Sequence, residues 1–216
     1  MTTSRISRRM MVLPHADGRL YEGIGYKSHG NTPVFLYISD AGVGRTTTDA
    51  IQEELGAQLA AAGYDCFALN GQPEQGHGDV SGRPSDLLVF LRGAFESFQL
   101  AFGVRDFAKV AYGRGAWGTV GALEESMTAQ LVWIEAPMDS LEEMLRMSVK
   151  TEEGAHWVFA ADRSSPKELR YIEGIVPASS TVLVPDADPT FRNGLRALGN
   201  TLVHCLQKND GRSGLR

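Results

Sequence analysis

With 216 residues, of which 43% are hydrophobic and 22% charged, the chain has the composition of one soluble globular domain with a full core. Its formal net charge of -5 removes the attraction that dominates binding to nucleic acids and anionic membranes, so neither partner is expected. The 2 cysteines, Cys66 and Cys205, exclude a disulfide framework and are predicted to be buried thiols, and the lack of a long apolar run favours a cytoplasmic location.

The first predicted elements are two short strands at residues 10–13 and 20–26. Asp17-Gly18 between them is a dipeptide typical of tight hairpin turns, so the chain is expected to open with an antiparallel pair. Residues 33–38 form an apolar run without alternation, which is typical of a parallel strand covered on both faces. A helix is predicted over residues 48–62, because apolar residues recur there at helical spacing and a glycine follows the last of them.

Strands and helices alternate through the rest of the chain. The further predicted strands are residues 64–69, 109–112, 131–134, 157–160 and 181–184, and the further predicted helices are residues 86–102, 118–126, 138–147, 166–171 and 191–206. This order predicts an α/β fold in which right-handed crossovers build a mostly parallel sheet with helices on both faces. Residues 1–208 are expected to form this one domain, with no cap domain and with a flexible tail over residues 209–216, and a homo-oligomer is left open.

Four segments at the ends of predicted strands carry recognisable motifs. They are Ser-Asp-Ala-Gly-Val-Gly at 39–44, Tyr-Gly-Arg-Gly-Ala-Trp-Gly at 112–118, Ala-Asp-Arg-Ser-Ser-Pro at 161–166 and Asp-Ala-Asp-Pro-Thr-Phe at 186–191. In this order they resemble the oxyanion loop, nucleophile elbow, acid loop and histidine loop of the α/β-hydrolase superfamily, particularly its small capless members of the dienelactone hydrolase type. The resemblance covers most of the chain and implies the α/β-hydrolase fold.

The resemblance also assigns the catalytic triad, and two of its positions hold residues that cannot do the chemistry. Gly115 stands where the family has its nucleophilic serine, and Pro189 stands where it has the catalytic histidine. Asp162 occupies the position of the triad acid. Because a triad works as a unit, the resemblance implies a scaffold without serine acyl transfer. The expected function is that of a pseudoenzyme that binds a small ligand or a partner protein, as an accessory subunit in a metabolic or biosynthetic pathway.

Acidic residues follow several predicted strands, where open parallel sheets form their ligand crevice. These residues are Asp40, Glu135, Asp162, Asp186 and Asp188. Such carboxyls could hold a cation or keep a proton as an acid, although acidic residues are also common in solvated loops. They leave open an enzyme with a different acid–base chemistry, a hydrolase, lyase, isomerase or cyclase, in which Asp162, Asp188, Glu135 or His77 acts. No cofactor and no metal ligand set is assigned.

The remaining candidate ligand contacts lie in the two glycine-rich loops. Ala41 and Gly42 belong to the oxyanion-like loop, and Arg114 and Ala116 flank Gly115 in the elbow-like turn. Arg114 would bind an anionic ligand or form an ion pair with a carboxylate across the crevice, either Asp162 or Asp188. Residues 39–46 also approximate a phosphate-binding loop, because they are rich in glycine and join a strand to a helix, so a nucleotide-binding protein is a further alternative.

Overall fold

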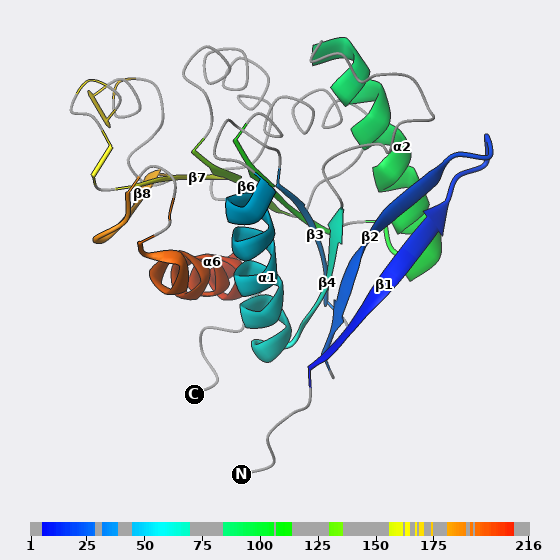
Figure 1. Cartoon of the computed structure of the whole chain (residues 1–216), viewed down its shortest axis with the longest axis horizontal. Helices are drawn as coiled ribbons and strands as arrows, with labels where there is room; N and C mark the ends of the chain where they lie inside the picture. The colour runs from blue at the N-terminus through cyan, green and yellow to red at the C-terminus, as the bar shows by residue number, and fades with distance from the viewer. Residues whose placement is uncertain are drawn as a thin grey trace.

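A computed structural model gives the architecture of the chain (Figure 1). The residues it describes are 6–28, 32–38, 45–69, 84–105, 107–113, 130–135, 156–161, 163–164, 167, 169–170, 174, 181–188, 191 and 193–209. The strands are β1 (Ser7–Pro14), β2 (Leu20–Lys27), β3 (Thr32–Ile38), β4 (Tyr64–Leu69), β5 (Ala108–Tyr112), β6 (Gln130–Ile134), β7 (His156–Ala161) and β8 (Thr181–Val184). The helices are α1 (Arg45–Ala61), α2 (Pro84–Phe102) and α6 (Leu195–Asn209).

The strands form one mixed sheet in the order β1-β2-β4-β3-β5-β6-β7-β8. β2 pairs antiparallel with both β1 and β4, whereas all other neighbouring strands pair in parallel. The turn between β1 and β2 contains Gly18, which has a φ of 88° and donates its N–H to the His15 carbonyl at 3.0 Å. The predicted hairpin and the predicted mostly parallel sheet are therefore confirmed.

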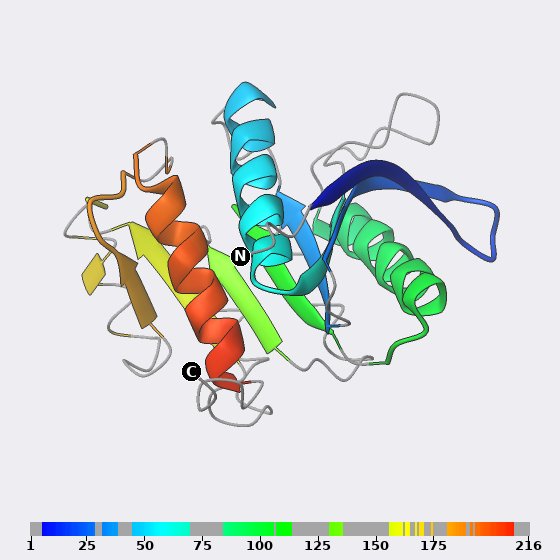
Figure 2. The same ribbon diagram turned by 90° about the horizontal axis from the view of Figure 1, so that it is seen from below.

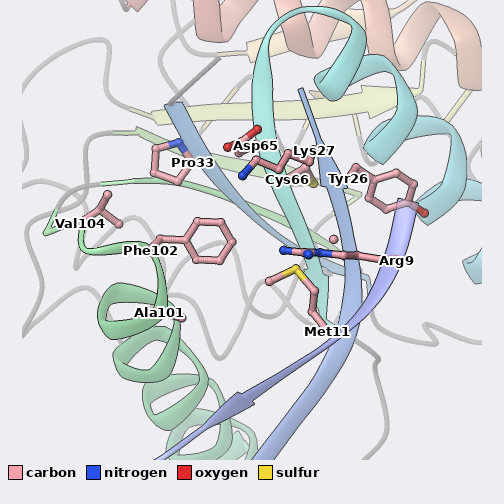
Figure 3. Close-up of a pocket in the computed structure, with 11 residues that line it drawn as sticks. Arg9, Met11, Tyr26, Lys27, Pro33, Asp65, Cys66, Ala101, Phe102 and Val104 are labelled. Atoms are coloured by element: carbon pink, nitrogen blue, oxygen red, sulfur yellow. The ribbon is translucent and has the colours of Figure 1, made fainter. Parts of the chain in front are cut away.

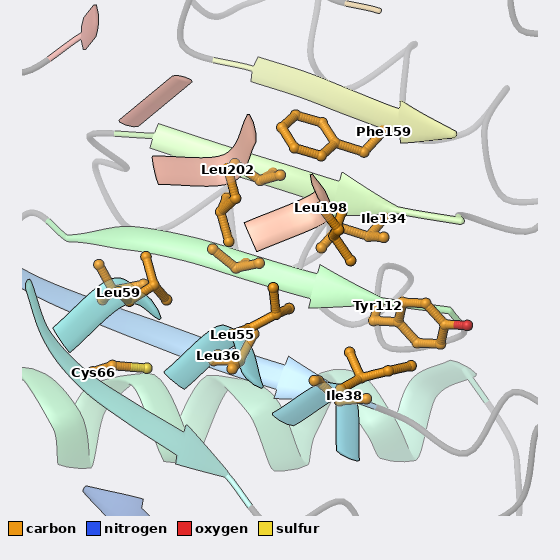
Figure 4. Close-up of a cluster of buried hydrophobic side chains, with 14 of the residues drawn as sticks. Leu36, Ile38, Leu55, Leu59, Cys66, Tyr112, Ile134, Phe159, Leu198 and Leu202 are labelled. Atoms are coloured by element: carbon orange, nitrogen blue, oxygen red, sulfur yellow. The ribbon is translucent and has the colours of Figure 1, made fainter. Parts of the chain in front are cut away.

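Two apolar cores cover opposite faces of the sheet, as the uninterrupted apolar run in β3 predicts. Val34, Leu36 and Ile38 belong to the core that the sheet forms with α1 and α6 (Figure 4). Phe35 and Tyr37, which point the other way, belong to the core formed with α2. Figure 2 shows α1 and α6 crossing the sheet next to one another, in agreement with their direct contact.

For the elements that the structure describes in full, the predicted bounds agree with the structure to within a few residues, except at the last helix. α6 begins at Leu195 and not at residue 191. Phe191 has a φ of 51° and Gly194 a φ of 95°, so both have left-handed backbone and a right-handed helix cannot run through them. The Asn193 N–H donates instead to Asp188 Oδ2 at 3.0 Å. The interaction with Asp188 thus holds the chain in a turn before α6 starts.

Of three further predicted helices, two are not tested and one is tested only in part. Residues 118–126 and 138–147 lie outside the described residues, and within 166–171 the described residues Lys167, Leu169 and Arg170 are helical. In the parts of the chain that the structure describes, nothing forms a cap domain over the sheet. None of the described helices has both the length and the apolar character needed to cross a lipid bilayer.

Candidate functional site

Parallel pairing brings the carboxyl ends of β3, β5, β6 and β7 to one edge of the sheet. The strand register places Tyr112 beside both Ile38 and Ile134, and Ile134 beside Phe159. Residues that follow these strands therefore lie at the edge where open α/β sheets bind their ligands. Two predicted site residues, Glu135 after β6 and Asp188 after β8, are described there. Together with Tyr112 we call them the carboxyl-edge site.

Glu135 is held by hydrogen bonds to the neighbouring strand. Its N–H donates to the Phe159 carbonyl at 3.0 Å, and its Oε1 accepts the Ala161 N–H at 2.7 Å. The Ser164 hydroxyl, 3.4 Å away, donates to the same oxygen. The carboxylate of Glu135 thus fixes the end of β7, immediately before the position of the predicted triad acid.

Asp188 organises the segment between β8 and α6. Its Oδ2 accepts the Asn193 N–H at 3.0 Å, and its carbonyl accepts the Phe191 N–H at 2.8 Å. The loop after β7 joins this segment, since the Arg163 N–H donates to the Ala187 carbonyl at 3.2 Å. These bonds tie together the two segments in which the sequence places the triad acid and the histidine.

Tyr112 is the residue on which the charges of both acidic residues act. It is buried, with 1% of its surface exposed, and its ring packs edge-on against Phe191 with the centroids 6.3 Å apart. Burial raises the pKa of Tyr112 well above its ordinary value, and the charges of Glu135 and Asp188 raise it further. Both carboxylates therefore act on the same end of β5. Sequence reasoning missed Tyr112, whose only signal is that it ends an apolar strand before a glycine.

Backbone strain is concentrated at this edge. Among the described residues, three that are not glycine have a left-handed φ, and they are Glu135 (48°), Asp186 (58°) and Phe191 (51°). Each such conformation costs on the order of 1–2 kcal/mol and persists only where its surroundings hold it, which is common at functional sites. Within the described ranges, no group of three His, Cys, Asp or Glu side chains is placed to hold a metal ion.

Solved structures share this architecture over nearly the whole chain. A lidless α/β serine hydrolase from Xanthomonas campestris matches with a TM-score of 0.70 at 14% identity, covering 96% of both chains. An α/β serine hydrolase homologue from Coxiella burnetii matches with a TM-score of 0.73 at 14% identity, covering 92% of this chain and 97% of that one. This chain has the α/β-hydrolase fold.

A third protein with the α/β-hydrolase fold is dienelactone hydrolase from Anabaena variabilis. The match has a TM-score of 0.68 at 13% identity, and it covers 94% of this chain and 98% of the dienelactone hydrolase chain. The sequence itself matches no protein-family model and no curated protein. The likeness to these structures therefore concerns the fold.

In the α/β-hydrolase fold of this chain, Gly113 directly follows β5 and is the described residue of the elbow-like motif. It has a φ of 62°, and its N–H donates to the Ile134 carbonyl at 2.9 Å. A side chain would be strained in this conformation, which explains the glycine. The predicted site residues that lie outside the described ones are Asp40, Ala41, Gly42, His77, Arg114, Gly115, Ala116, Asp162 and Pro189. Their roles, and the phosphate-binding interpretation of residues 39–46, stay predictions.

Proposed function

We propose that this protein is a pseudoenzyme with the α/β-hydrolase fold, which binds a small ligand at the carboxyl-edge site without forming an acyl-enzyme. The observation that carries the proposal is the presence of Gly115 and Pro189 where the motifs of the fold have serine and histidine. Glycine has no side chain to attack a carbonyl, and proline has no group that accepts a proton. At most, binding and oxyanion stabilisation remain.

The contacts of the two described acidic residues support binding rather than proton transfer. Glu135 Oε1 accepts hydrogen bonds from the Ala161 N–H and the Ser164 hydroxyl, and Asp188 Oδ2 accepts the Asn193 N–H. Each carboxylate is therefore engaged in fixing a loop that frames the site. A frame built in this way favours a preorganised pocket for a ligand.

Ester hydrolysis tests the absence of acyl-enzyme chemistry. The substrates are p-nitrophenyl acetate, p-nitrophenyl butyrate and a matching thioester, and the wild type is compared with a Gly115→Ser/Pro189→His double variant. We expect the wild type to hydrolyse them at the rate of buffer alone and the double variant to exceed that rate, because Asp162 is still present. Wild-type turnover well above the buffer rate that survives Asp162→Ala would contradict the proposal.

The location of binding is tested separately by NMR with unreactive carbonyl compounds, such as phenylacetamide and small lactams. A compound that binds as proposed shifts the amide signals of Gly113, Glu135 and Asp188. Signals that shift only elsewhere in the chain would count against a ligand at the carboxyl-edge site.

A second candidate function is acid–base catalysis at the same site, and the charges of Glu135 and Asp188, which both act on the buried Tyr112, favour it. This alternative expects turnover of a substrate that falls by about tenfold or more in Glu135→Gln or Asp188→Asn, with a pH profile set by a carboxyl group. A protein that only binds its ligand has no turnover, so neither substitution would lower a rate.

A further inference from the structure

A cavity lies at the opposite edge of the sheet from the carboxyl-edge site. Its volume is about 360 Å³, within the range of small-molecule pockets. Pro33 and Asp65 line it from the amino ends of β3 and β4, whereas the strands run away from it toward the carboxyl-edge site. The β1–β2 hairpin and the end of α2 form its other walls (Figure 3). We call it the amino-edge cavity.

The floor and one wall of the amino-edge cavity are apolar. Gly25 leaves room on β2, and the Met11 side chain fills part of it, because a Cβ at Gly25 would clash with Met11 Sδ. Phe102 ends α2, and the left-handed Gly103 turns the chain so that Val104 also faces the cavity. An apolar body of a ligand would find a thioether, an aromatic ring and an aliphatic side chain there.

The rim carries two cations, Arg9 and Lys27, whose charges are available to a ligand. Both are exposed, and among the described residues neither forms an ion pair or a side-chain hydrogen bond. Figure 3 shows the Arg9 side chain extending from β1 toward Phe102. Arg8 is a natural contrast, because it points to the other face of the sheet and its Nη1 lies 2.9 Å from Glu53 Oε1 of α1.

One carboxylate also lines the amino-edge cavity, but part of it is already occupied. Asp65 Oδ1 accepts the Ser28 N–H at 2.9 Å and the Ser28 hydroxyl at 3.3 Å. The carboxyl end of α2 adds partial negative charge to the same edge. Preference for an anion therefore depends on Arg9 and Lys27, and it is tested by removing their charges.

We propose that the amino-edge cavity binds an organic anion with an apolar body, such as an aryl or acyl carboxylate. The body lies against Met11, Phe102 and Val104, and the carboxylate takes charge-assisted hydrogen bonds from Arg9 and Lys27. The planar guanidinium of Arg9 suits a carboxylate because it can donate two parallel hydrogen bonds. Binding of this anion uses no residue of the carboxyl-edge site and involves no covalent step.

The test uses 2-naphthoate as the probe and 2-naphthamide as its uncharged match, titrated into the full chain and followed by fluorescence. We expect one molecule of naphthoate to bind, with a Kd on the order of 1 mM or tighter, which is the scale for a ligand of this size. Arg9→Gln/Lys27→Gln should weaken naphthoate binding by about tenfold or more and leave naphthamide binding unchanged. Arg8→Gln removes the same charge from the other face of the sheet and should leave both unchanged.

Two further measurements locate the ligand. The ¹³C-methyl signal of Met11, identified by its loss in Met11→Leu, should shift with naphthoate, and Gly25→Ala should weaken binding because the new Cβ must displace the Met11 thioether. The Gly115→Ser/Pro189→His variant should bind naphthoate as the wild type does, which separates this cavity from the carboxyl-edge site. Equal affinity for naphthoate and naphthamide, equal losses in Arg8→Gln and in the rim variant, or an unshifted Met11 methyl would overturn the proposal.

Discussion

The hydrogen bonds of Glu135 at the carboxyl-edge site can be tested by measuring the stability of Glu135 variants. Glu135→Ala removes the oxygen that accepts the Ala161 N–H at 2.7 Å. Ala161 is 0% exposed, and a buried donor that loses its acceptor costs about 1–3 kcal/mol. Alanine also keeps the strain of a φ near 48°. We therefore expect the free energy of unfolding to fall by about 1–3 kcal/mol.

Two other substitutions at Glu135 separate the hydrogen bond from the strain. Glu135→Gln keeps an acceptor oxygen and should cost less than about 1 kcal/mol. Glu135→Gly loses the acceptor but relieves the left-handed backbone, so it should be more stable than Glu135→Ala by about 1 kcal/mol.

Urea unfolding followed by tryptophan fluorescence measures all three variants, with unchanged m-values as the check that the same surface unfolds. The expected order of stability is Gln, then Gly, then Ala. An alanine variant within about 0.5 kcal/mol of the wild type would contradict the stabilising role of the Glu135 hydrogen bond. A glycine variant less stable than the alanine one would contradict the backbone strain at Glu135.

Three further predictions concern the rest of the chain. His15 Nε2 lies 2.9 Å from Glu96 Oε2 and its Nδ1 lies 2.6 Å from Asp17 Oδ1, and these bonds raise the pKa of His15 above 6.5. The contribution of His15 to stability is therefore complete below its unfolded-state pKa and is lost as the pH rises through its higher folded-state pKa. The melting temperature should then fall with rising pH more steeply in the wild type than in His15→Gln. Parallel curves for the two proteins would contradict this. Phe98 is 0% exposed and packs among aromatic rings, so Phe98→Ala should lower the free energy of unfolding by about 3–5 kcal/mol. Leu183 is 46% exposed, so Leu183→Ala should change it by less than about 0.5 kcal/mol. Equal effects of the two substitutions in chemical denaturation would contradict this placement of the core. Burial raises the pKa of the free Cys66 thiol and raises that of the free Cys205 thiol to about 11, so a thiol reagent should modify neither in the folded protein at neutral pH and both in urea, and rapid modification of the folded chain would be inconsistent with their placement.

The order of strands and helices could be predicted because local chemistry sets it. The apolar run in β3 is buried on both faces, and the glycine after α1, Gly63, has the left-handed φ of 95° that ends a helix. The start of α6 could not be predicted in the same way. Phe191, Leu195 and Leu198 keep helical spacing, but the bond from Asn193 to the Asp188 carboxylate and the backbone of Phe191 hold the chain in a turn.

The edge of the sheet at which Glu135 and Asp188 lie could be predicted, but their contacts could not. The sequence shows that Glu135 and Asp188 follow strands, and topology alone brings such residues to one edge. It does not show that the Glu135 carboxylate accepts the N–H of a residue 26 positions away, nor that the charges of both acids act on Tyr112. The bond between His15 and Glu96, 81 positions apart, was beyond sequence reasoning for the same reason.

The proposed pseudoenzyme contains no nucleophile able to form an acyl-enzyme. This absence is tested most directly by incubating the purified wild type with a fluorophosphonate, which forms a stable adduct on activated serines, and by measuring the intact mass. We expect an unchanged mass for the wild type under conditions in which an active serine hydrolase is fully labelled. One stoichiometric adduct on the folded wild type, absent after unfolding in urea before labelling, would contradict it and would place the catalytic centre on whichever residue carries the label.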